Sequence, residues 1–382
     1  MGRLTGMTAE VIRQADMKLL ALCCAATVYG IVLVASATNF RGTYRYVIIQ
    51  SAAMLIGIVF YLAFSCIDIV ELVKKWRWLL GFNVGFMLLL LTPLGQERNG
   101  NRAWISADWL PVDIQPAEIV KITFVLLLAR QLEWLREERD LRSFSNIAQI
   151  GAHLLLMLGL IVVISSDVGS ALVYVFIFLC MAFAAGAAMR WFFISGGVAA
   201  AGIAALWAAG FIKEYMIGRF LTIFDHDLDP LGVGWQQGRS MLALGSGKLW
   251  GQGLFNGTQT QSAYKSSLPE RQTDFIFSVA GEELGMVGCV AILILLLAIV
   301  TRCLLTSRRA RTTMESYVCV GMAGMLIFQI IANIGMCLYV MPVIGLTLPF
   351  FSYGGSSIVT LFAAMGIVSG VKMRTPPEWL RG

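Results

Sequence analysis

Long apolar blocks separated by short polar stretches make up most of the chain of 382 residues. Ten blocks approach the length of about 20 residues that a helix needs to cross the hydrocarbon core of a bilayer. We therefore predict an all-α polytopic integral membrane protein, one transmembrane domain over residues 1–382. The ten predicted helices cover residues 17–37, 44–66, 77–95, 112–132, 147–164, 168–188, 191–211, 275–303, 316–340 and 353–372.

One polar connection, residues 212–274 between the seventh and eighth predicted helices, is much longer than the others. A loop of this length in a compact protein is usually functional or disordered. Its aromatic and apolar content argues against disorder. We expect it to be a large functional loop outside the cytoplasm.

The basic residues predict the orientation of the helices. Ten spans put both termini on one side, and that side carries 18 of the 29 Lys and Arg residues. The short loops on the opposite side carry four. The positive-inside rule therefore places both termini in the cytoplasm and residues 212–274 outside. The net charge of +6 is explained by this topology, and a nucleic-acid partner is not expected.

The composition supports a membrane protein and excludes several other classes. Hydrophobic residue types make up 58% and charged types 14%, whereas about a quarter of an ordinary soluble domain is charged. This excludes a soluble enzyme, a disordered chain and a secreted disulfide scaffold. With two histidines and no C-x-x-C pair among the eight cysteines, a histidine-based or zinc metal centre is not expected.

Glu118 and Lys121 are charged residues inside the fourth predicted helix. A spacing of three places both side chains on one helix face, within reach of each other. A buried ion pair that fixes helix packing is one interpretation. Charges within a membrane helix are also typical of functional sites, so the pair could line a cavity open to the outer side.

Asp274 stands where the long loop enters the eighth predicted helix. A carboxylate at the edge of a low-dielectric region can have a raised pKa and act as a general base. The alternative is a helix N-cap, because Thr273 or Asp274 precedes an apolar run. Glu282 and Glu283 follow within the same helix and must find partners or a hydrated cavity.

Three further polar positions are candidates for the same site. Asp167 is either a helix cap or a cavity residue, and Asn333 is either an interhelical hydrogen-bonding residue or functional. Residues 345–357 contain Pro349 and the Gly354-Gly355 pair, which permit non-helical backbone. Exposed amides in such a segment could hold a diphosphate or another anion.

Four stretches resemble the SEDS family of shape, elongation, division and sporulation proteins, which includes RodA, FtsW and SpoVE. They are Asn99-Gly-Asn-Arg-Ala-Trp104-Ile, Gln115-Pro-Ala-Glu118-Ile-Val-Lys121, Leu268-Pro-Glu-Arg-Gln-Thr-Asp274-Phe-Ile-Phe with Gly281-Glu-Glu-Leu-Gly285, and residues 345–357. The resemblance extends over the whole chain. The short N-terminal tail and the absence of a long C-terminal extension favour the RodA type.

The resemblance implies a peptidoglycan glycosyltransferase in the bacterial cytoplasmic membrane, with roles in elongation, cell shape or division. The enzyme would polymerise lipid II, a disaccharide-pentapeptide on undecaprenyl diphosphate, into β-1,4 glycan strands and release undecaprenyl diphosphate. By similarity Asp274 would be the essential acidic residue. It would act as the base, or it would hold a divalent cation such as Mg²⁺ or Mn²⁺ on the diphosphate.

Further residues on the outer side are expected to contact substrate. Some belong to the motifs, and others are outer cations that could neutralise the leaving diphosphate. The set is Glu118, Lys121, Arg102, Trp104, Arg219, Arg239, Lys265, Glu270, Ser352, Gly354, Gly355 and Ser356.

The expected partners are lipid II, membrane lipid and a class B penicillin-binding protein that supplies transpeptidation. Two other functions remain open. A lipid II flippase would use the same charges to move a head group across the membrane, and a scaffold would only recruit the cross-linking enzyme.

Overall fold

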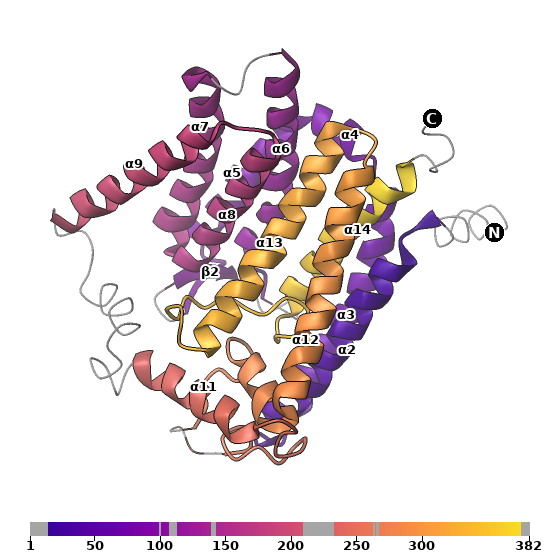
Figure 1. The fold of residues 1–382 in the computed structure, drawn as a ribbon, viewed down its shortest axis with the longest axis vertical. Helices are drawn as coiled ribbons and strands as arrows, with labels where there is room; N and C mark the ends of the chain where they lie inside the picture. Colours follow the sequence, from indigo (N-terminus) through magenta and orange to yellow (C-terminus); the bar gives the residue numbers. More distant parts are fainter. Residues whose placement is uncertain are drawn as a thin grey trace.

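The computed structural model describes residues 14–98, 101–106, 113–138, 143–208, 233–262, 264 and 267–375. These residues form a bundle of helices with one small hairpin (Figure 1). The elements are α2 (Met17–Asn39), α3 (Arg45–Cys66), α4 (Ile69–Lys74), α5 (Trp76–Leu88), the 3₁₀ turn η1 (Leu89–Leu91), β1 (Gly95–Arg98), β2 (Asn101–Ile105), α6 (Pro116–Glu138), α7 (Phe144–Gly159), the π-helical turn η2 (Leu160–Ser165), α8 (Val168–Ala184), α9 (Met189–Ala208), α11 (Val233–Gly247), α12 (Ile276–Arg309), α13 (Thr313–Cys337) and α14 (Gly355–Arg374).

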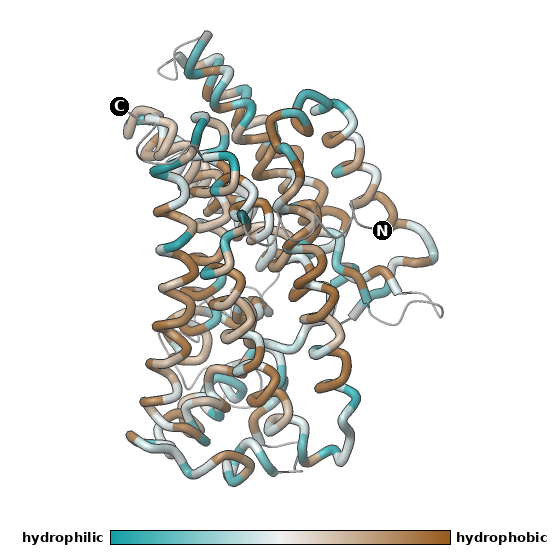
Figure 2. The backbone as a smooth tube through the Cα atoms, turned by 90° about the vertical axis from the view of Figure 1, so that its right-hand side faces the viewer, coloured by the Kyte–Doolittle hydropathy of each residue, from teal (hydrophilic) through white to brown (hydrophobic). Residues whose placement is uncertain are grey.

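A helix overlaps each of the ten predicted ranges, but the helices differ in length and apolar composition. Within the described residues, six are long and apolar enough to span a membrane: α2, α3, α7 with η2, α12, α13 and α14. The helices Trp76–Leu91 and Val168–Ala184 are apolar but shorter. Figure 2 shows apolar residues concentrated along the middle of the bundle and hydrophilic ones towards its two ends. This distribution fits an integral membrane protein.

The prediction of an all-α fold is wrong at one point, after the third predicted helix. The helix ends at Leu91 rather than residue 95, and Pro93 follows, a residue that disfavours helix in the position before it. Strands β1 and β2 then pair antiparallel, with Gly95 opposite Ile105 and Gln96 opposite Trp104. The sequence signal was the Asn-Gly dipeptide at 99–100, a common hairpin turn.

The eighth predicted helix is also not one straight span. Gly285 has φ +67° and ψ −164°, which breaks α12 into two parts. Phe277 and Cys289 would be about 18 Å apart along a straight helix. Instead Sγ of Cys289 lies 3.9 Å from the carbonyl oxygen of Phe277, so residues 276–284 fold back against residues 286–309. A left-handed φ favours glycine at this tip.

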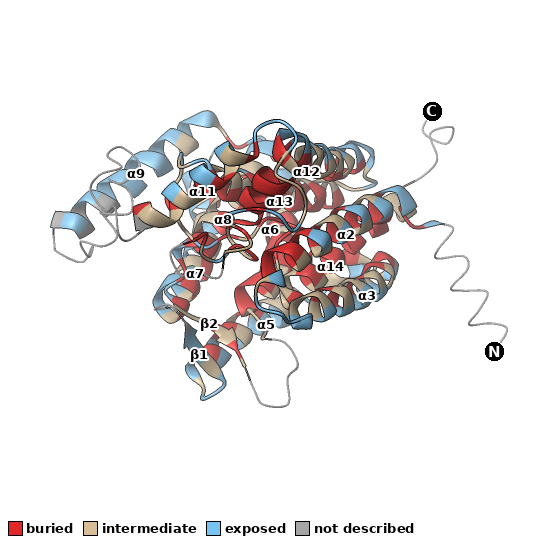
Figure 3. Cartoon of the chain, turned by 90° about the horizontal axis from the view of Figure 1, so that it is seen from below, coloured by how far each residue is buried: buried red, intermediate tan, exposed pale blue. Residues whose placement is uncertain are grey.

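Close helix packing and a polar cluster hold the bundle together. Helices α3 and α14 approach through Gly57 and Gly366, where an added Cβ would lie within 3 Å of Phe362 or Tyr61. Such small residues permit close packing of membrane helices. Near the N- and C-terminal ends of the described chain, Asp16 forms ion pairs with Arg302 at 2.7 Å and Lys372 at 3.0 Å. Figure 3 shows the buried residues gathered at the centre of the bundle.

Helix α9 leans away from the other helices (Figures 1 and 3). Its apolar side chains are largely exposed in the protein alone, with Phe193 at 75% and Val198 at 67%. In a membrane protein such side chains contact lipid. The exposed side chains of α9 are therefore available to contact lipid.

Candidate functional site

Asp274 lies two residues before the start of α12, and it does not cap that helix. The N-cap position is Phe275, and no side chain there bonds the first helical amides. The capping interpretation of Asp274 is therefore wrong. The carbonyl oxygen of Asp274 accepts a hydrogen bond of 2.8 Å from Nδ2 of Asn333 on α13, which fixes the backbone at this position.

The polar segment before α14 packs directly against the residues around Asp274. Oγ of Ser352 donates to the carbonyl oxygen of Thr273 at 2.6 Å. The amide of Tyr353 donates to the carbonyl oxygen of Gln272 at 2.8 Å. Asn333 also donates from Nδ2 to the carbonyl oxygen of Leu346 at 2.7 Å. Helices α12, α13 and α14 thus meet at Asp274 through hydrogen bonds that require these particular groups.

The backbone on both sides of this junction is strained. Glu270 has φ +39° and Phe350 has φ +68°, values that side-chain-bearing residues rarely adopt. Gly345 has φ +70°, and a Cβ placed there would lie 4.0 Å from Oδ2 of Asp274. Residues in such conformations cluster at functional sites, where surrounding structure holds them in place.

The surroundings of Asp274 raise its pKa from 3.8 to about 7. Desolvation by the surrounding protein is the main cause, the negative charge of Glu270 adds to it, and a hydrogen bond with Thr273 opposes it. A carboxyl group with this pKa can accept a proton near neutral pH and release it again. A pKa in this range suits a general base, which must also lie within hydrogen-bonding reach of the attacking hydroxyl.

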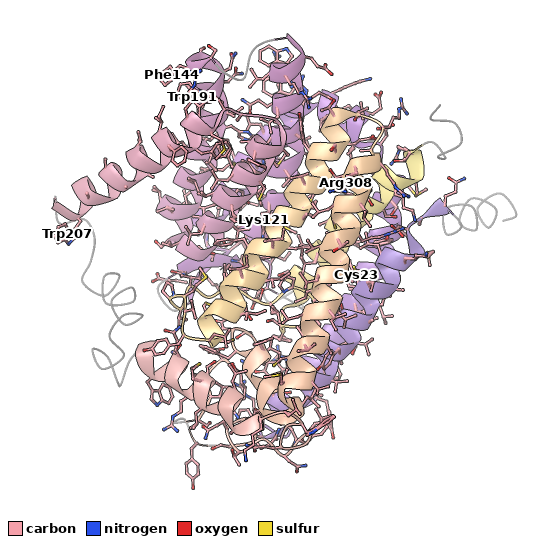
Figure 4. The ribbon with its side chains drawn as sticks, in the orientation of Figure 1. Cys23, Lys121, Phe144, Trp191, Trp207 and Arg308 are labelled. Carbon is pink, nitrogen blue, oxygen red and sulfur yellow. The ribbon has the colours of Figure 1, made fainter. Side chains whose placement is uncertain are left out.

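Glu118 and Lys121 form a buried ion pair near the start of α6. Oε1 of Glu118 lies 2.6 Å from Nζ of Lys121, and both side chains are less than a tenth exposed. Figure 4 shows Lys121 inside the helix bundle. The pair is therefore buried within α6, while its roles in helix packing and in contact with substrate both remain predictions.

A chain of contacts leads from the start of α6 to Ile344, the residue before Gly345. The amide of Glu118 donates to the carbonyl oxygen of Gln115, and Nε2 of Gln115 donates to Asp167 at 3.1 Å. Asp167 caps α8 by accepting from the amide of Ser170, so it is a helix cap. Gly169 on the same turn abuts the carbonyl of Ile344, where a Cβ would be only 2.3 Å away.

The other predicted substrate-binding residues lie in three places. Arg102 and Trp104 are on β2, where Nη2 of Arg102 donates to the carbonyl oxygen of Thr92 at 3.1 Å. Arg239 on α11 lies 6.0 Å from the centre of the Trp235 ring. Gly354 caps α14, and Gly355 and Ser356 form its first turn. Arg219 and Lys265 lie outside the described residues.

Gln50 is a site residue that the sequence analysis missed. It is fully buried in α3, donates from Nε2 to the carbonyl oxygen of Ser352 at 2.9 Å, and accepts from the amide of Gly354 at 3.2 Å. The available signal was a single amide side chain within an otherwise apolar helix. Gln50 thereby connects α3 to the segment that packs against Asp274.

Glu282 and Glu283 bind residues 255–261 and Ser36 to the tip of the α12 hairpin. The Glu282 carboxylate accepts from the amides of Gln259 at 2.7 Å and Thr260 at 2.8 Å. Glu283 accepts from Nε2 of Gln261 at 2.8 Å and from Oγ of Ser36 at 2.5 Å. Both carboxylates are therefore satisfied by partners rather than by a hydrated cavity.

Replacing Glu282 by Ala is expected to release residues 255–261. The amides of Gln259 and Thr260 would lose their acceptor, at a cost of about 1–3 kcal/mol for each buried group left unpaired. We expect a lower melting temperature in detergent and faster proteolysis within 255–261. Glu71→Ala is the matched control, because that side chain is 65% exposed and pairs only at the surface. Equal proteolysis of both variants would contradict the assigned role of Glu282.

The described residues do not form a metal site by themselves. They contain no group of three or more His, Cys, Asp or Glu side chains arranged to hold an ion. A cation at Asp274 would therefore need further ligands from the substrate diphosphate, from water or from residues outside the described ranges.

Comparison with known proteins identifies the family. Residues 16–376 match the FtsW/RodA/SpoVE family of cell cycle proteins. Peptidoglycan glycosyltransferase MrdB of Escherichia coli strain K12 is 35% identical over 287 residues, covering 75% of this chain and 74% of MrdB. Stage V sporulation protein E of Bacillus subtilis strain 168 is 34% identical over 300 residues, covering 78% and 79%.

Solved structures share the fold. A chain from a peptidoglycan synthase complex aligns with a TM-score of 0.77 and 30% identity, covering 94% of this chain and 97% of its own. RodA of Thermus thermophilus aligns with a TM-score of 0.69 and 27% identity, covering 95% and 98%. The chain therefore belongs to the FtsW/RodA/SpoVE family of cell cycle proteins, the SEDS family that its motifs resemble.

Proposed function

We propose that this protein polymerises lipid II into β-1,4 glycan strands at the outer face of the bacterial cytoplasmic membrane, for cell elongation, shape or division. The observation that carries the proposal is Asp274, whose pKa is raised to about 7 at the junction of α12, α13 and the segment before α14. Relatives of this protein that are named peptidoglycan glycosyltransferases support glycosyl transfer as the class of reaction.

In this reaction Asp274 accepts the proton of the acceptor 4-hydroxyl as that oxygen attacks the anomeric carbon of the donor. The new C–O bond forms on the face opposite the bond to the diphosphate, so an α-linked donor yields a β linkage. Undecaprenyl diphosphate leaves with the electron pair of the broken bond. General-base catalysis of this type contributes roughly 10²–10⁴-fold to a rate.

The surrounding residues are assigned to orientation and charge. Gly355 and Ser356 in the first turn of α14 would hold the leaving diphosphate, because helix N-termini present free amides to anions. Gly354 would let the chain approach closely, since its own amide already donates to Gln50. The Glu118–Lys121 pair would line the cavity and orient the substrate. Four basic side chains would neutralise the charge of the diphosphate, as predicted from the sequence: Arg102, Arg219, Arg239 and Lys265. A divalent cation would assist the same neutralisation, and no step above depends on one.

The proposed membrane arrangement has ten spanning helices and both termini in the cytoplasm. The basic residues support it, since Arg302, Lys372 and Arg374 gather at the end of the bundle where the described chain begins and ends. The segment 212–274 would then be the outer loop. The outward lean of α9 would leave room for the lipid tail of the substrate to enter from the bilayer.

A class B penicillin-binding protein is the proposed partner. The structurally similar chain with a TM-score of 0.77 comes from a peptidoglycan synthase complex that coordinates polymerization and crosslinking. A transpeptidase beside this protein would cross-link the strands as they form.

The experiment that tests the function supplies lipid II to the outer leaflet of proteoliposomes that contain this protein and a class B partner. Glycan strands on a gel are the expected product, without prior transport of lipid II. If lipid II instead appears in the opposite leaflet and no glycan forms, the flippase explanation is correct. If neither occurs and the partner still binds, the protein is a scaffold.

Asn333→Leu is expected to lower the polymerisation rate about tenfold or more. The substitution removes the donor that holds the carbonyls of Asp274 and Leu346, and displacements of about 1 Å at a reacting group can cost a hundredfold. The loss should appear in kcat more than in KM, since Asn333 acts through Asp274. Gln329→Leu, a buried amide one turn earlier on α13, is the control. Equal losses in the two variants would assign Asn333 to helix packing alone.

A further inference from the structure

A cavity lies between α5, α6 and α7, away from Asp274. Its volume is about 360 Å³, and its apolar walls include Trp76 and Leu80 of α5 and Leu127 and Trp134 of α6. Its polar side chains come from Arg130, Gln131, Gln149 and His153, with no aspartate or glutamate in the lining. The cavity therefore combines a large apolar surface with one uncompensated positive charge.

Arg130 carries that positive charge and lies half-buried over an aromatic ring. Its Cζ atom is 5.4 Å from the centre of the Trp76 ring, and Cζ of Arg77 is 5.4 Å from the same ring. Within the described chain Arg130 makes no ion pair or hydrogen bond. A guanidinium that is partly withdrawn from water without an anionic partner is a suitable binding group for a phosphate.

A polar group without a partner lies on another wall of the same cavity. Nδ1 of His153 is 3.2 Å from Oε1 of Gln131, and Nε2 of Gln131 donates to the carbonyl of Gln149 at 3.3 Å. Nε2 of His153 is buried and has no hydrogen-bond partner within the described residues. A buried polar atom without a partner is uncommon in proteins and suggests a ligand or water in its place.

The position of the cavity identifies the source of the anion. Beyond Arg130 on α6, Arg136 donates to Tyr317 and Glu133 accepts from Met314, at the end of the bundle where α12 passes into α13. In the orientation proposed above this is the cytoplasmic end. The surface of α5 and α7 that would face lipid carries exposed apolar side chains, among them Trp78, Phe82 and Leu155. An anion reaching this cavity from the bilayer would carry acyl chains.

We propose that this cavity binds one anionic phospholipid of the cytoplasmic leaflet. Its phosphodiester would lie against Arg130, and an acyl chain would lie along Trp76 and Leu127. Since Nδ1 of His153 donates to Oε1 of Gln131, its Nε2 would accept a hydrogen bond from a hydroxyl of the lipid head group. Basic pockets between membrane helices on the cytoplasmic side favour such head groups. The inference depends on the membrane orientation given under the proposed function, but not on the polymerisation reaction.

The test counts phospholipids that stay bound to the full-length protein. Protein from vesicles of phosphatidylcholine with phosphatidylglycerol is transferred to mild detergent, and native mass spectrometry counts the retained lipids. We expect one phosphatidylglycerol to be retained in preference to phosphatidylcholine. Arg130→Gln should lower that preference about fivefold, the usual effect of one basic side chain at a membrane surface. Arg130→Lys should retain most of it.

The matched control is Arg308→Gln, which removes an exposed arginine from the end of α12 (Figure 4). It should retain phosphatidylglycerol as the wild type does. The proposal is overturned if Arg130→Gln and wild type retain the lipid equally, or if soluble glycerol phosphate displaces it from the wild type. Because bound lipid is counted without turnover, this result is independent of whether the protein polymerises lipid II.

Discussion

Asp274→Asn should abolish polymerisation of lipid II by the purified protein. The amide occupies the same space as the carboxylate but cannot accept the proton of the attacking hydroxyl. We expect the rate to fall by roughly 10²–10⁴-fold, the contribution of a general base. The measurement is glycan formation from purified lipid II in the presence of the class B partner. Near-normal glycan formation by this variant would show that Asp274 is not the base.

A stability measurement separates loss of chemistry from loss of folding in this variant. The folded protein raises the pKa of Asp274 to about 7, so the folded state binds its proton more tightly than the unfolded state. Wild-type stability therefore declines as the pH rises from about 4 to about 7, whereas Asn does not titrate. Above about pH 7 the Asp274→Asn protein should melt no lower than the wild type. Glu270→Gln, which removes the neighbouring charge, should retain more activity.

Lys121→Met should strongly destabilise the protein, because it leaves the Glu118 carboxylate buried without its partner. Removing one member of a buried ion pair typically costs about 3–5 kcal/mol. Lys74→Met is the matched control, since the Lys74–Glu71 pair has the same spacing and is 65% exposed. An exposed pair contributes only about 0–1 kcal/mol. Thermal unfolding in detergent compares the two variants.

The double variant Glu118→Gln/Lys121→Met distinguishes the two roles considered for the pair. It removes both charges and should recover most of the stability lost in Lys121→Met, because replacing a whole buried pair is often nearly neutral. If the pair also orients substrate, the double variant should polymerise slowly even though it is folded. Wild-type activity in the double variant would restrict Glu118 and Lys121 to helix packing.

The helices were predictable from the sequence because membrane spans depend on block length and hydrophobicity, which can be counted. The α12 hairpin was not predictable in this way. Residues 276–309 contain no proline and only one pair of adjacent charges before Arg302, so they are typical of a single helix, and only the backbone at Gly285 breaks it. The strands β1 and β2 were missed for a related reason, since each is too short to give a periodic pattern.

For the site, residue types could be predicted but their partners could not. Charge within apolar sequence singled out Glu118, Lys121 and Asp274, and the contacts of Asn333 and Ser352 then placed the segment before α14 against Asp274. The N-cap alternative for Asp274 failed because helix α12 begins one residue later than a cap would require. Gln50 lies 302 positions from Ser352 in the sequence, and such a contact depends on the tertiary fold.

The pH dependence of polymerisation by the wild-type protein tests the assignment of Asp274 most directly. A base must be ionised to accept the proton, and the pKa of Asp274 is about 7. We predict that kcat is constant above about pH 8 and falls about tenfold for each pH unit below about 6, with the midpoint near 7. Melting curves across the same range exclude unfolding as the cause. A rate that stays constant from about pH 8 down to about pH 5 would contradict the role of Asp274 as general base.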